Sequence, residues 1–385
     1  MNRRNSVFHV EQIRTLLVGF LLLVSASVFA QGSGRIQKAM QPILDSGKLA
    51  GYVGIRGTVN GITEWEWGGY ADLKNKVPMQ KDSLFWIASM SKPITATAVL
   101  MLVDEGKISL DDPLDKFFPE FKNAFLLKTE NGKTVVQRIK KSPTVRQLLS
   151  HTAGLEFITP YMSKFGIDSL PPQKLAYTAS LFPFKYEPGT GYQYSNTGID
   201  IASAILEKVS GLSLEEFLQT RLFDPLEMKD TTFYPSKEQM ARLAKSYKWN
   251  KEKKVLEETN IGFLNEPYSD RAIRFPEGGG GLFSTAEDSF RFHQMLAAKG
   301  VYKGKRILSE KAIDEMSKVQ TGFENHKYGL GMNVDTDSFG HGGAHATNGR
   351  VYKKEGKVVI FMIQFAGGGT NASEAARAFV SSEQK

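Results

Sequence analysis

The most informative part of this sequence is the octapeptide Phe85-Trp86-Ile87-Ala88-Ser89-Met90-Ser91-Lys92. The apolar positions that follow it recur at helical spacing, so we predict a helix from Ser89 to Glu105, with Pro93 in its first turn. Residues three apart share one face of a helix, which brings the Lys92 amine close to the Ser89 hydroxyl. A serine becomes a strong nucleophile when a neighbour accepts its proton, and a partly buried lysine with a lowered pKa can do this. The pair therefore indicates a candidate nucleophile and its activator, although a serine three residues before a lysine also fits an ordinary capped helix.

A second motif, Tyr194-Ser195-Asn196, stands directly before a predicted helix that ends at Val209. A tyrosine hydroxyl close to a lysine ammonium can have a lowered pKa and act as a general base or acid. The Asn196 amide can donate to a substrate carbonyl and accept from the lysine. Since Asn196 can simply cap the helix and Tyr194 can pack beside Tyr192, this motif taken alone favours a structural role.

A third motif, Gly340-His341-Gly342-Gly343-Ala344, falls on a strand predicted from Phe339 to Thr347. Glycines weaken a strand and indicate the close approach of a ligand or another backbone. We expect the N–H of Ala344 and the N–H of Ser89 to form an oxyanion hole, with His341 and Gly343 beside the substrate. The alternative is a flexible strand edge with a solvated histidine. The run from Gly278 to Gly281 is explained equally well by a plain loop.

Predicted strands lie at both ends of the chain, and predicted helices lie between them. A helix from Ile36 to Ser46 precedes a hairpin of two strands, Tyr52–Val59 and Thr63–Tyr70, for which Asn60-Gly61 predicts a type I′ turn. The later strands are predicted at Gly281–Ser284, Tyr328–Val334, Phe339–Thr347, Arg350–Lys353 and Lys357–Ala366. A closing helix is predicted at Ala372–Ser381. This order predicts an α+β fold in which N- and C-terminal strands form one antiparallel sheet flanked by helices. The middle of the chain, roughly residues 107–275, then forms a mainly helical second lobe.

The first thirty residues read as a signal peptide. Arg3, Arg4 and Arg14 form a basic region, Leu16 to Val24 is almost entirely apolar, and Val28-Phe29-Ala30 offers small residues for cleavage. An uncleaved anchor is the alternative, but the apolar stretch up to Ala30 is shorter than the roughly 20 residues that span a bilayer. We therefore expect export to the periplasm or the medium, no stable membrane anchor after cleavage, and a single domain over residues 31–385.

Composition excludes several classes of protein. The 385 residues contain no cysteine, which rules out disulfides, zinc thiolate sites, cysteine nucleophiles and a lipoprotein anchor. The net charge of +8 is scattered, so we expect a basic surface and no nucleic-acid partner. The chain also lacks a Gly-x-Ser-x-Gly elbow, a His-Glu-x-x-His motif and a phosphate-binding Gly-x-x-x-x-Gly-Lys motif. We accordingly expect no metal and no cofactor.

Taken together, the motifs resemble those of penicillin-binding proteins and β-lactamases, and in particular the class C branch, in which Ser-x-x-Lys is followed by Tyr-x-Asn. The resemblance covers nearly the whole chain after the leader, through Gly68–Asp72, Phe85–Lys92, Gly106–Pro113, Leu148–Leu155, Pro188-Gly189 before Tyr194, and Gly280–Thr285. It implies a β-lactamase/transpeptidase-like fold, with Ser89 as the acylated nucleophile and Lys92 as its activator. It further implies that Tyr194 acts with Lys92 in proton transfer and that Asn196 positions a small ester, amide or lactam.

The sequence departs from the β-lactamase pattern at His341, where those enzymes usually carry a lysine followed by Thr-Gly. A neutral histidine offers no permanent charge to a substrate carboxylate. The departure favours a serine esterase or amidase similar to family VIII esterases. A β-lactamase or D-Ala-D-Ala carboxypeptidase is the first alternative, and a non-catalytic binding protein on the same scaffold is the second.

Overall fold

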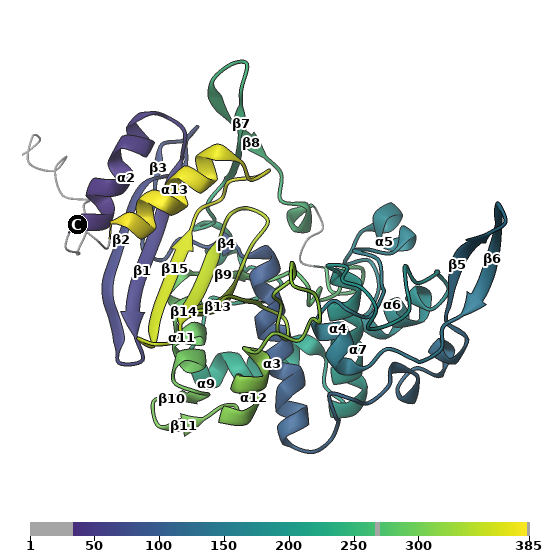
Figure 1. Cartoon of the computed structure of the whole chain (residues 1–385). Helices are drawn as coiled ribbons and strands as arrows, with labels where there is room; N and C mark the ends of the chain where they lie inside the picture. The colour runs from purple at the N-terminus through teal and green to yellow at the C-terminus, as the bar shows by residue number, and fades with distance from the viewer. Residues whose placement is uncertain (1–33, 266–269, 383–385) are drawn as a thin grey trace, which may run out of the picture.

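The computed structural model describes residues 34–265 and 270–382, so the predicted signal peptide lies outside the described residues. At its centre is a seven-stranded sheet in the order β12-β13-β14-β15-β1-β2-β3, with every neighbouring pair antiparallel (Figure 1). The N-terminal strand β1 (Gly51–Thr58) pairs with the last strand, β15 (Lys357–Met362), with Val53 opposite Met362. The predicted α+β class and the joining of the two chain ends in one antiparallel sheet are therefore confirmed.

The other strands of this sheet are β2 (Gly61–Asp72), β3 (Val77–Pro78), β12 (Asn333–Val334), β13 (Ser338–Gly342) and β14 (Asn348–Tyr352). Small two-stranded pairs lie outside it: β4 (Phe85–Trp86) with β9 (Phe283–Ser284), β5 (Phe125–Glu130) with β6 (Lys133–Arg138), β7 (Ser246–Asn250) with β8 (Val255–Thr259), and β10 (Val301–Tyr302) with β11 (Lys305–Arg306).

Helices cover both faces of the sheet. On one face lie α2 (Arg35–Asp45) and α13 (Thr370–Ser381), and α11 (Ala286–Ala297) packs against the other face (Figure 1). Two glycines of β1 make this packing possible. A Cβ on Gly54 would lie 2.6 Å from the ring of Phe379 in α13, and a Cβ on Gly57 would lie 2.5 Å from the ring of Phe290 in α11. The strand therefore admits an aromatic ring from each layer.

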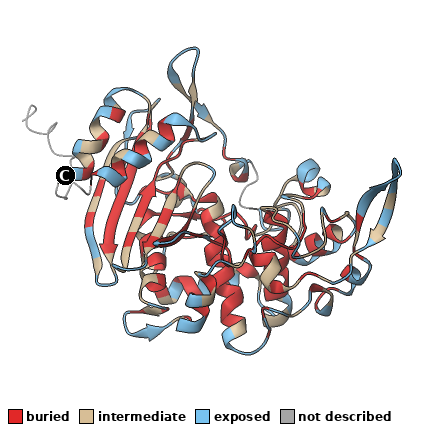
Figure 2. Cartoon of the chain, in the orientation of Figure 1, coloured by how far each residue is buried: buried red, intermediate tan, exposed pale blue. Residues whose placement is uncertain are grey.

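Helix α3 (Ser91–Asp104) lies between the sheet and the helical lobe. Every residue from Ser91 to Leu102 is buried, so the helix presents no face to solvent and is covered from both sides (Figure 2). The remaining helices are α4 (Val145–Leu149), α5 (Pro160–Phe165), α6 (Pro172–Ala179), α7 (Asn196–Ser210), α8 (Leu214–Leu218), α9 (Asp224–Leu226), α10 (Lys237–Met240) and α12 (Glu310–Met316). No helix in the described residues is long and apolar enough to cross a membrane.

The predicted type I′ turn at Asn60-Gly61 is wrong. The hairpin forms, but Thr58 pairs with Gly61, so Val59 and Asn60 make the turn and neither has a positive φ. The strands shift register between Arg56 and Gly57, which moves the turn by one residue. An Asn-Gly turn with both φ angles positive occurs instead at Asn131-Gly132, between β5 and β6, in a hairpin that sequence analysis missed.

Several predicted boundaries are also corrected. The helix predicted from Ser89 begins at Ser91, after a 3₁₀ turn over Ala88–Met90. The strand predicted over Tyr328–Val334 shrinks to Asn333–Val334, because the chain turns back at Gly331, with a φ of 72°, and Tyr328 pairs with Asn333 across this turn. Only Phe283–Ser284 is extended within the predicted strand Gly281–Ser284, and it pairs with β4 outside the main sheet.

Candidate active site

Ser89 lies in a tight turn that joins β4 to α3. Ala88, directly before it, has a φ of 46°, a left-handed conformation that non-glycine residues adopt at a cost of about 1–3 kcal/mol. Ser91 holds the turn from inside, since its hydroxyl donates to Ala88 O at 2.7 Å and accepts from the N–H of Leu282 at 3.2 Å. The first N–H groups of a helical turn have no acceptor within the helix, so the Ser89 N–H makes no helical hydrogen bond.

Lys92 is completely buried and faces Ser89. Its Nζ lies 3.2 Å from Ser89 Oγ, 2.7 Å from Asn196 Oδ1 and 2.6 Å from the carbonyl oxygen of Gly279. An ammonium has three N–H donors, and these three acceptors use all of them. The geometry fixes the amine against the candidate nucleophile.

Burial lowers the pKa of Lys92 to about 8, because a charged ammonium loses its hydration inside the protein. Negative charge on the neighbouring Glu277 and Asp200 carboxyl groups opposes this effect and keeps the pKa from falling further. A lysine with this pKa has an appreciable fraction of free amine near neutral pH. It is therefore able to accept the proton of Ser89.

Tyr194 lies beside Lys92 but does not have the lowered pKa that we expected. Burial raises the pKa of Tyr194, and its hydrogen bond with Ser89 offsets this only in part. The Lys92 ammonium stands 4.7 Å from the centre of the tyrosine ring, where it contacts the π face. Since all three ammonium N–H groups are used elsewhere, none stabilises a phenolate. Tyr194 is a neutral phenol, which can donate a proton.

His341 is buried, with 4% of its surface exposed, and it contacts side chains of the site. Its Nδ1 lies 2.6 Å from Gly342 O, and because a carbonyl only accepts, Nδ1 carries the proton. Its Nε2 then accepts from Tyr328 Oη at 3.0 Å and lies 3.4 Å from Tyr194 Oη. Burial and the charge of Lys92 lower the pKa of His341 to about 3, so the ring is neutral. We expected His341 beside the substrate. In the structure it contacts Tyr194 and is not among the residues that line the cavity.

The second motif is held by a helix cap and a histidine. Ser195 is the N-cap of α7, and its hydroxyl accepts from the N–H of Gly198 at 2.9 Å. Asn196 is then the first helical residue, and because its Oδ1 accepts from Lys92, its amide N–H groups remain to donate to a substrate. His151 also fixes the motif, because its Nδ1 accepts the N–H of Ser195 at 3.2 Å. Sequence analysis found no role for His151.

The third motif ends the strand early. Strand β13 stops at Gly342, and Gly343 begins a turn in which its N–H donates to Thr347 O at 2.7 Å. A Cβ on Gly343 would lie 2.4 Å from the carbonyl oxygen of Ile87, so glycine is required for the turn to contact the backbone before Ser89. Ala344 lines the same cavity as Ser89. Among the described residues, no acceptor is found for the Ala344 N–H.

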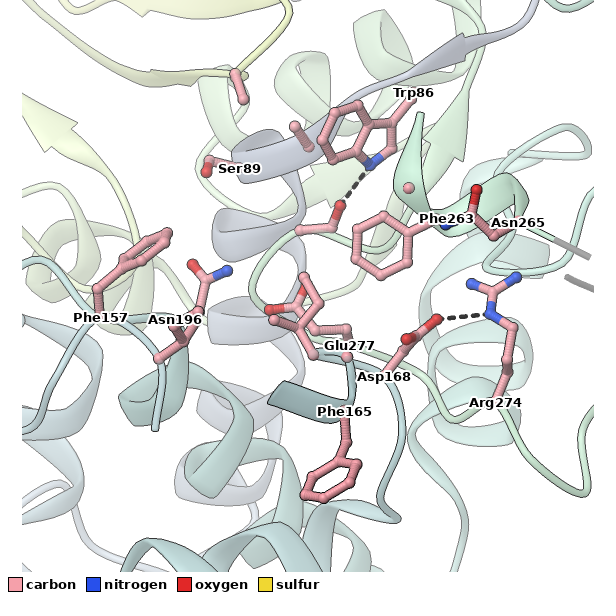
Figure 3. Close-up of a pocket in the computed structure, with 17 residues that line it drawn as sticks. Trp86, Ser89, Phe157, Phe165, Asp168, Asn196, Phe263, Asn265, Arg274 and Glu277 are labelled. Carbon is pink, nitrogen blue, oxygen red and sulfur yellow. Dashed lines mark hydrogen bonds and ion pairs between the residues drawn. The ribbon is translucent and has the colours of Figure 1, made fainter. Parts of the chain in front are cut away.

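The cavity in front of Ser89 has a volume of about 530 Å³ (Figure 3). Most of its wall is apolar and comes from Trp86, Phe157, Ile158, Phe165, Ile167 and Phe263. The indole N–H of Trp86 donates to Gly280 O at 2.7 Å, which fixes the ring as one wall. Far from Ser89, Arg274 pairs with Asp168 at 2.6 Å. The cavity thus has a polar end at the nucleophile, a large apolar section beyond it, and the Asp168–Arg274 ion pair at its far end.

Comparison with known proteins identifies the family. The family model named Beta-lactamase matches residues 36–381. The chain belongs to the beta-lactamase family. Its relatives in this family include Protein Rv1367c of Mycobacterium tuberculosis, 31% identical over 72% of this chain and 69% of that protein. Lovastatin esterase of Penicillium rubens is 30% identical over 65% of this chain and 63% of that protein.

Among solved structures, the beta-lactamase-family chain is similar to EstCE1, described as a hydrolase with promiscuous acyltransferase activity. The TM-score is 0.76 with 23% identity, and the match covers 91% of this chain and 98% of EstCE1. This likeness confirms the predicted β-lactamase-like fold. Membership of the family, together with relatives that are esterases, makes this chain a serine hydrolase.

The beta-lactamase-family site also contains residues that sequence analysis missed. Tyr328 anchors His341, and the carbonyl of Gly279 accepts from Lys92. Glu277 lines the cavity and is 2% exposed. The available signal was the glycine run after Glu277. A Cβ on Gly279 would lie 2.6 Å from Glu277 Oε1 and 3.0 Å from Asn196 Cγ, so side chains crowd this backbone.

In the described part of the chain, no group of three or more His, Asp or Glu side chains is arranged to hold a metal ion. The residues around Ser89 offer a nucleophile, an amine, a phenol and an amide. These are the groups that acyl transfer through a serine requires.

Proposed function

We propose that this chain is an exported serine esterase that acts on esters with a bulky apolar group, through an acyl-enzyme on Ser89. The observation that carries the proposal is the 3.2 Å contact between Lys92 Nζ and Ser89 Oγ at one end of a mainly apolar cavity. An apolar wall of this size favours hydrocarbon or aromatic groups, because burying them removes apolar surface from water.

In the proposed mechanism, the free amine of Lys92 accepts the proton of Ser89 while Oγ attacks the ester carbonyl. The N–H groups of Ser89 and Ala344 donate to the developing oxyanion, which is worth roughly 3 kcal/mol for each donor. Tyr194 donates its phenolic proton to the departing alkoxide and regains a proton from Lys92. Water then attacks the acyl-enzyme while the free amine of Lys92 accepts one of its protons, and Lys92 passes that proton to Ser89 Oγ as the acyl group leaves as a carboxylic acid. Each step balances without any group from outside the site except water.

A neutral side chain at position 341 argues for esters over carboxylate-bearing lactams. His341 is neutral and its Nε2 is used by two tyrosines, so it offers no charge-assisted hydrogen bond. Such a bond contributes about 1.5–3 kcal/mol, which corresponds to roughly a 10- to 150-fold change in affinity. The relation to a lovastatin esterase supports the same choice.

Parallel assays test this proposal. A nitrophenyl ester and a chromogenic cephalosporin are given to the same preparation, with Ser89→Ala as the control. We expect kcat/KM for the ester to exceed that for the cephalosporin, and both activities to be lost in Ser89→Ala. Faster turnover of the cephalosporin would replace the esterase with a β-lactamase. If the folded protein turned over neither substrate and did not react with a fluorophosphonate, it would be a binding protein.

Export is tested separately. The basic residues Arg3 and Arg4, the apolar stretch and Val28-Phe29-Ala30 support cleavage after Ala30. N-terminal sequencing of the protein from the periplasm or medium is expected to begin at Gln31. A membrane-bound product that keeps Arg3 and Arg4 would contradict the proposal.

A further inference from the structure

Two buried carboxyl groups, Asp200 and Glu277, lie behind Lys92 and have no part in the mechanism above. Asp200 comes from α7 and Glu277 from the segment before the glycine run, and each is only 2% exposed. Asp200 Oδ1 accepts the N–H of Gly279 at 3.2 Å. Asp200 Oδ2 and both oxygens of Glu277 are fully buried, and no N–H or O–H of the described residues donates to any of them.

The two carboxyl groups pack against the same peptide, because Asp200 accepts the N–H of Gly279 and a Cβ on Gly279 would lie 2.6 Å from Glu277 Oε1. Two carboxylates have no donor to offer each other, so their buried oxygens gain a donor only when one group carries a proton. Like charges held together out of water cannot both stay ionised, and burial together with the neighbouring carboxyl accordingly raises the pKa of Asp200. The orphaned oxygens and the shared peptide both indicate one shared proton and one negative charge.

One peptide links this pair to the lysine. The N–H of Gly279 donates to Asp200, and its carbonyl oxygen accepts from Lys92. A Cβ on Gly279 would lie only 2.6 Å from Glu277 Oε1, so this carboxyl group packs directly against the glycine. The lysine and the carboxyl pair therefore face each other across a single glycine, and all three side chains are buried.

We propose that Asp200 and Glu277 share one proton and act as a single negative charge that sets the pH at which Lys92 becomes a free amine. In this arrangement Lys92 and the pair are together neutral, which reduces the cost of burying an ammonium. Both are positioning residues, since they act on Ser89 only through Lys92. The inference rests on the proposed function, in which Lys92 accepts the proton of Ser89.

Other ionisable groups face the cluster and do not supply this charge. His151, His341 and Tyr194 surround Lys92 as neutral rings, because burial lowers the pKa of both histidines and raises that of the tyrosine. The negative charge of Asp168 contributes to raising the pKa of Glu277, but Asp168 itself is ion-paired with Arg274. The negative charge that stabilises the Lys92 ammonium therefore comes from Asp200 and Glu277.

The test measures the rate of Ser89 labelling by a fluorophosphonate against pH, for wild type, Glu277→Gln, Asp200→Asn and the double variant. In either single variant the shared proton is lost, and the remaining carboxylate keeps the negative charge while the new amide donates to it. We expect the ascending limb of the rate–pH profile to stay near that of wild type in both single variants. The double variant has no negative charge beside Lys92, so its limb moves to lower pH by about one unit or more.

Glu207→Gln is the matched control, because Glu207 is also a carboxyl group of α7 but accepts the N–H of Leu214 far from Lys92. Its limb is expected to match wild type. Two independent carboxylates would instead give a downward shift in each single variant, with the shifts adding in the double. That result, or a double variant whose limb does not move, would overturn the proposal.

Infrared spectroscopy gives a second measurement that does not need the double variant to fold. Wild type at neutral pH is expected to show the C=O band of a protonated buried carboxyl, and either single variant is expected to lose it. Absence of the band in wild type would overturn the shared proton. Failure of the fluorophosphonate to label Ser89 in folded wild type would instead overturn the proposed function, so the two failures are distinguishable.

Discussion

At Lys92, burial and charge act in opposite directions on one amine. Burial alone favours the free amine, and the nearby carboxyl pair favours the ammonium, which leaves the pKa at about 8. The three hydrogen bonds of Lys92 keep it aligned on Ser89 in the resting state. The residue therefore combines a fixed position with a proton affinity suited to neutral pH.

This pKa predicts the pH dependence of acylation. Below it Lys92 is an ammonium and cannot accept the proton of Ser89, and above it the free amine can. We expect kcat/KM for a nitrophenyl ester to rise about tenfold per pH unit at low pH and to level off above pH about 8. A flat profile from pH 5 to 9 in the folded enzyme would exclude Lys92 as the base.

The local motifs were predictable because their residues are close in sequence. Ser89 and Lys92 are one helical turn apart, and Asn196 follows Tyr194 by two positions. The raised pKa of Tyr194 was not predictable, since it depends on how deeply the folded chain buries the ring. Glu277 and Asp200 were missed for the same reason. They are far apart in sequence and meet only when the glycine run packs against α7.

At the level of elements, the turn after β13 is the contact that completes the site. Gly343 brings this turn onto the carbonyl of Ile87, directly before Ser89, and Ala344 reaches the cavity. Sequence analysis expected a close approach here from the glycines but placed them within a strand. The strand ends earlier because the turn must pack across the backbone of the neighbouring segment.

Adding a single methyl group tests this contact. We expect Gly343→Ala to lower kcat by about 100-fold, because the new Cβ meets Ile87 O and displaces the candidate oxyanion donor. Gly342→Ala is the control, since its Cβ has only a side-chain nitrogen at 3.3 Å and a carbonyl at 3.5 Å as neighbours. Steady-state kinetics of both variants measures the difference. Equal activities in the two would show that the turn does not position the oxyanion hole.

Across the whole molecule, the sheet separates a structural face from a catalytic one. Helices α2 and α13 close the outer face, where Phe379 stacks on Phe361 with 4.7 Å between ring centres. The joining of the chain ends was predictable from the order of strands and helices. The β5–β6 and β7–β8 hairpins were not predicted, because the middle of the chain reads mostly as helix.

Truncating the packed ring tests this separation. Phe379→Ala is expected to lower the free energy of unfolding by about 3–5 kcal/mol, as for other buried aromatic residues. The rate of Ser89 labelling in the folded protein is expected to stay unchanged, because the ring lies on the face opposite α11. Val380→Ala, at a position that is half exposed, is the control and is expected to change stability little. Urea unfolding measures both, and a slower labelling rate in folded Phe379→Ala would contradict the separation of the two faces.

The central claim is that Ser89 is the residue acylated during turnover. It is tested most directly by intact mass and peptide mapping after incubation with a fluorophosphonate. We predict one added group per chain, on the peptide that contains Ser89, and no added mass in Ser89→Ala. A label on any other residue, or no label on the folded wild-type protein, would contradict the account.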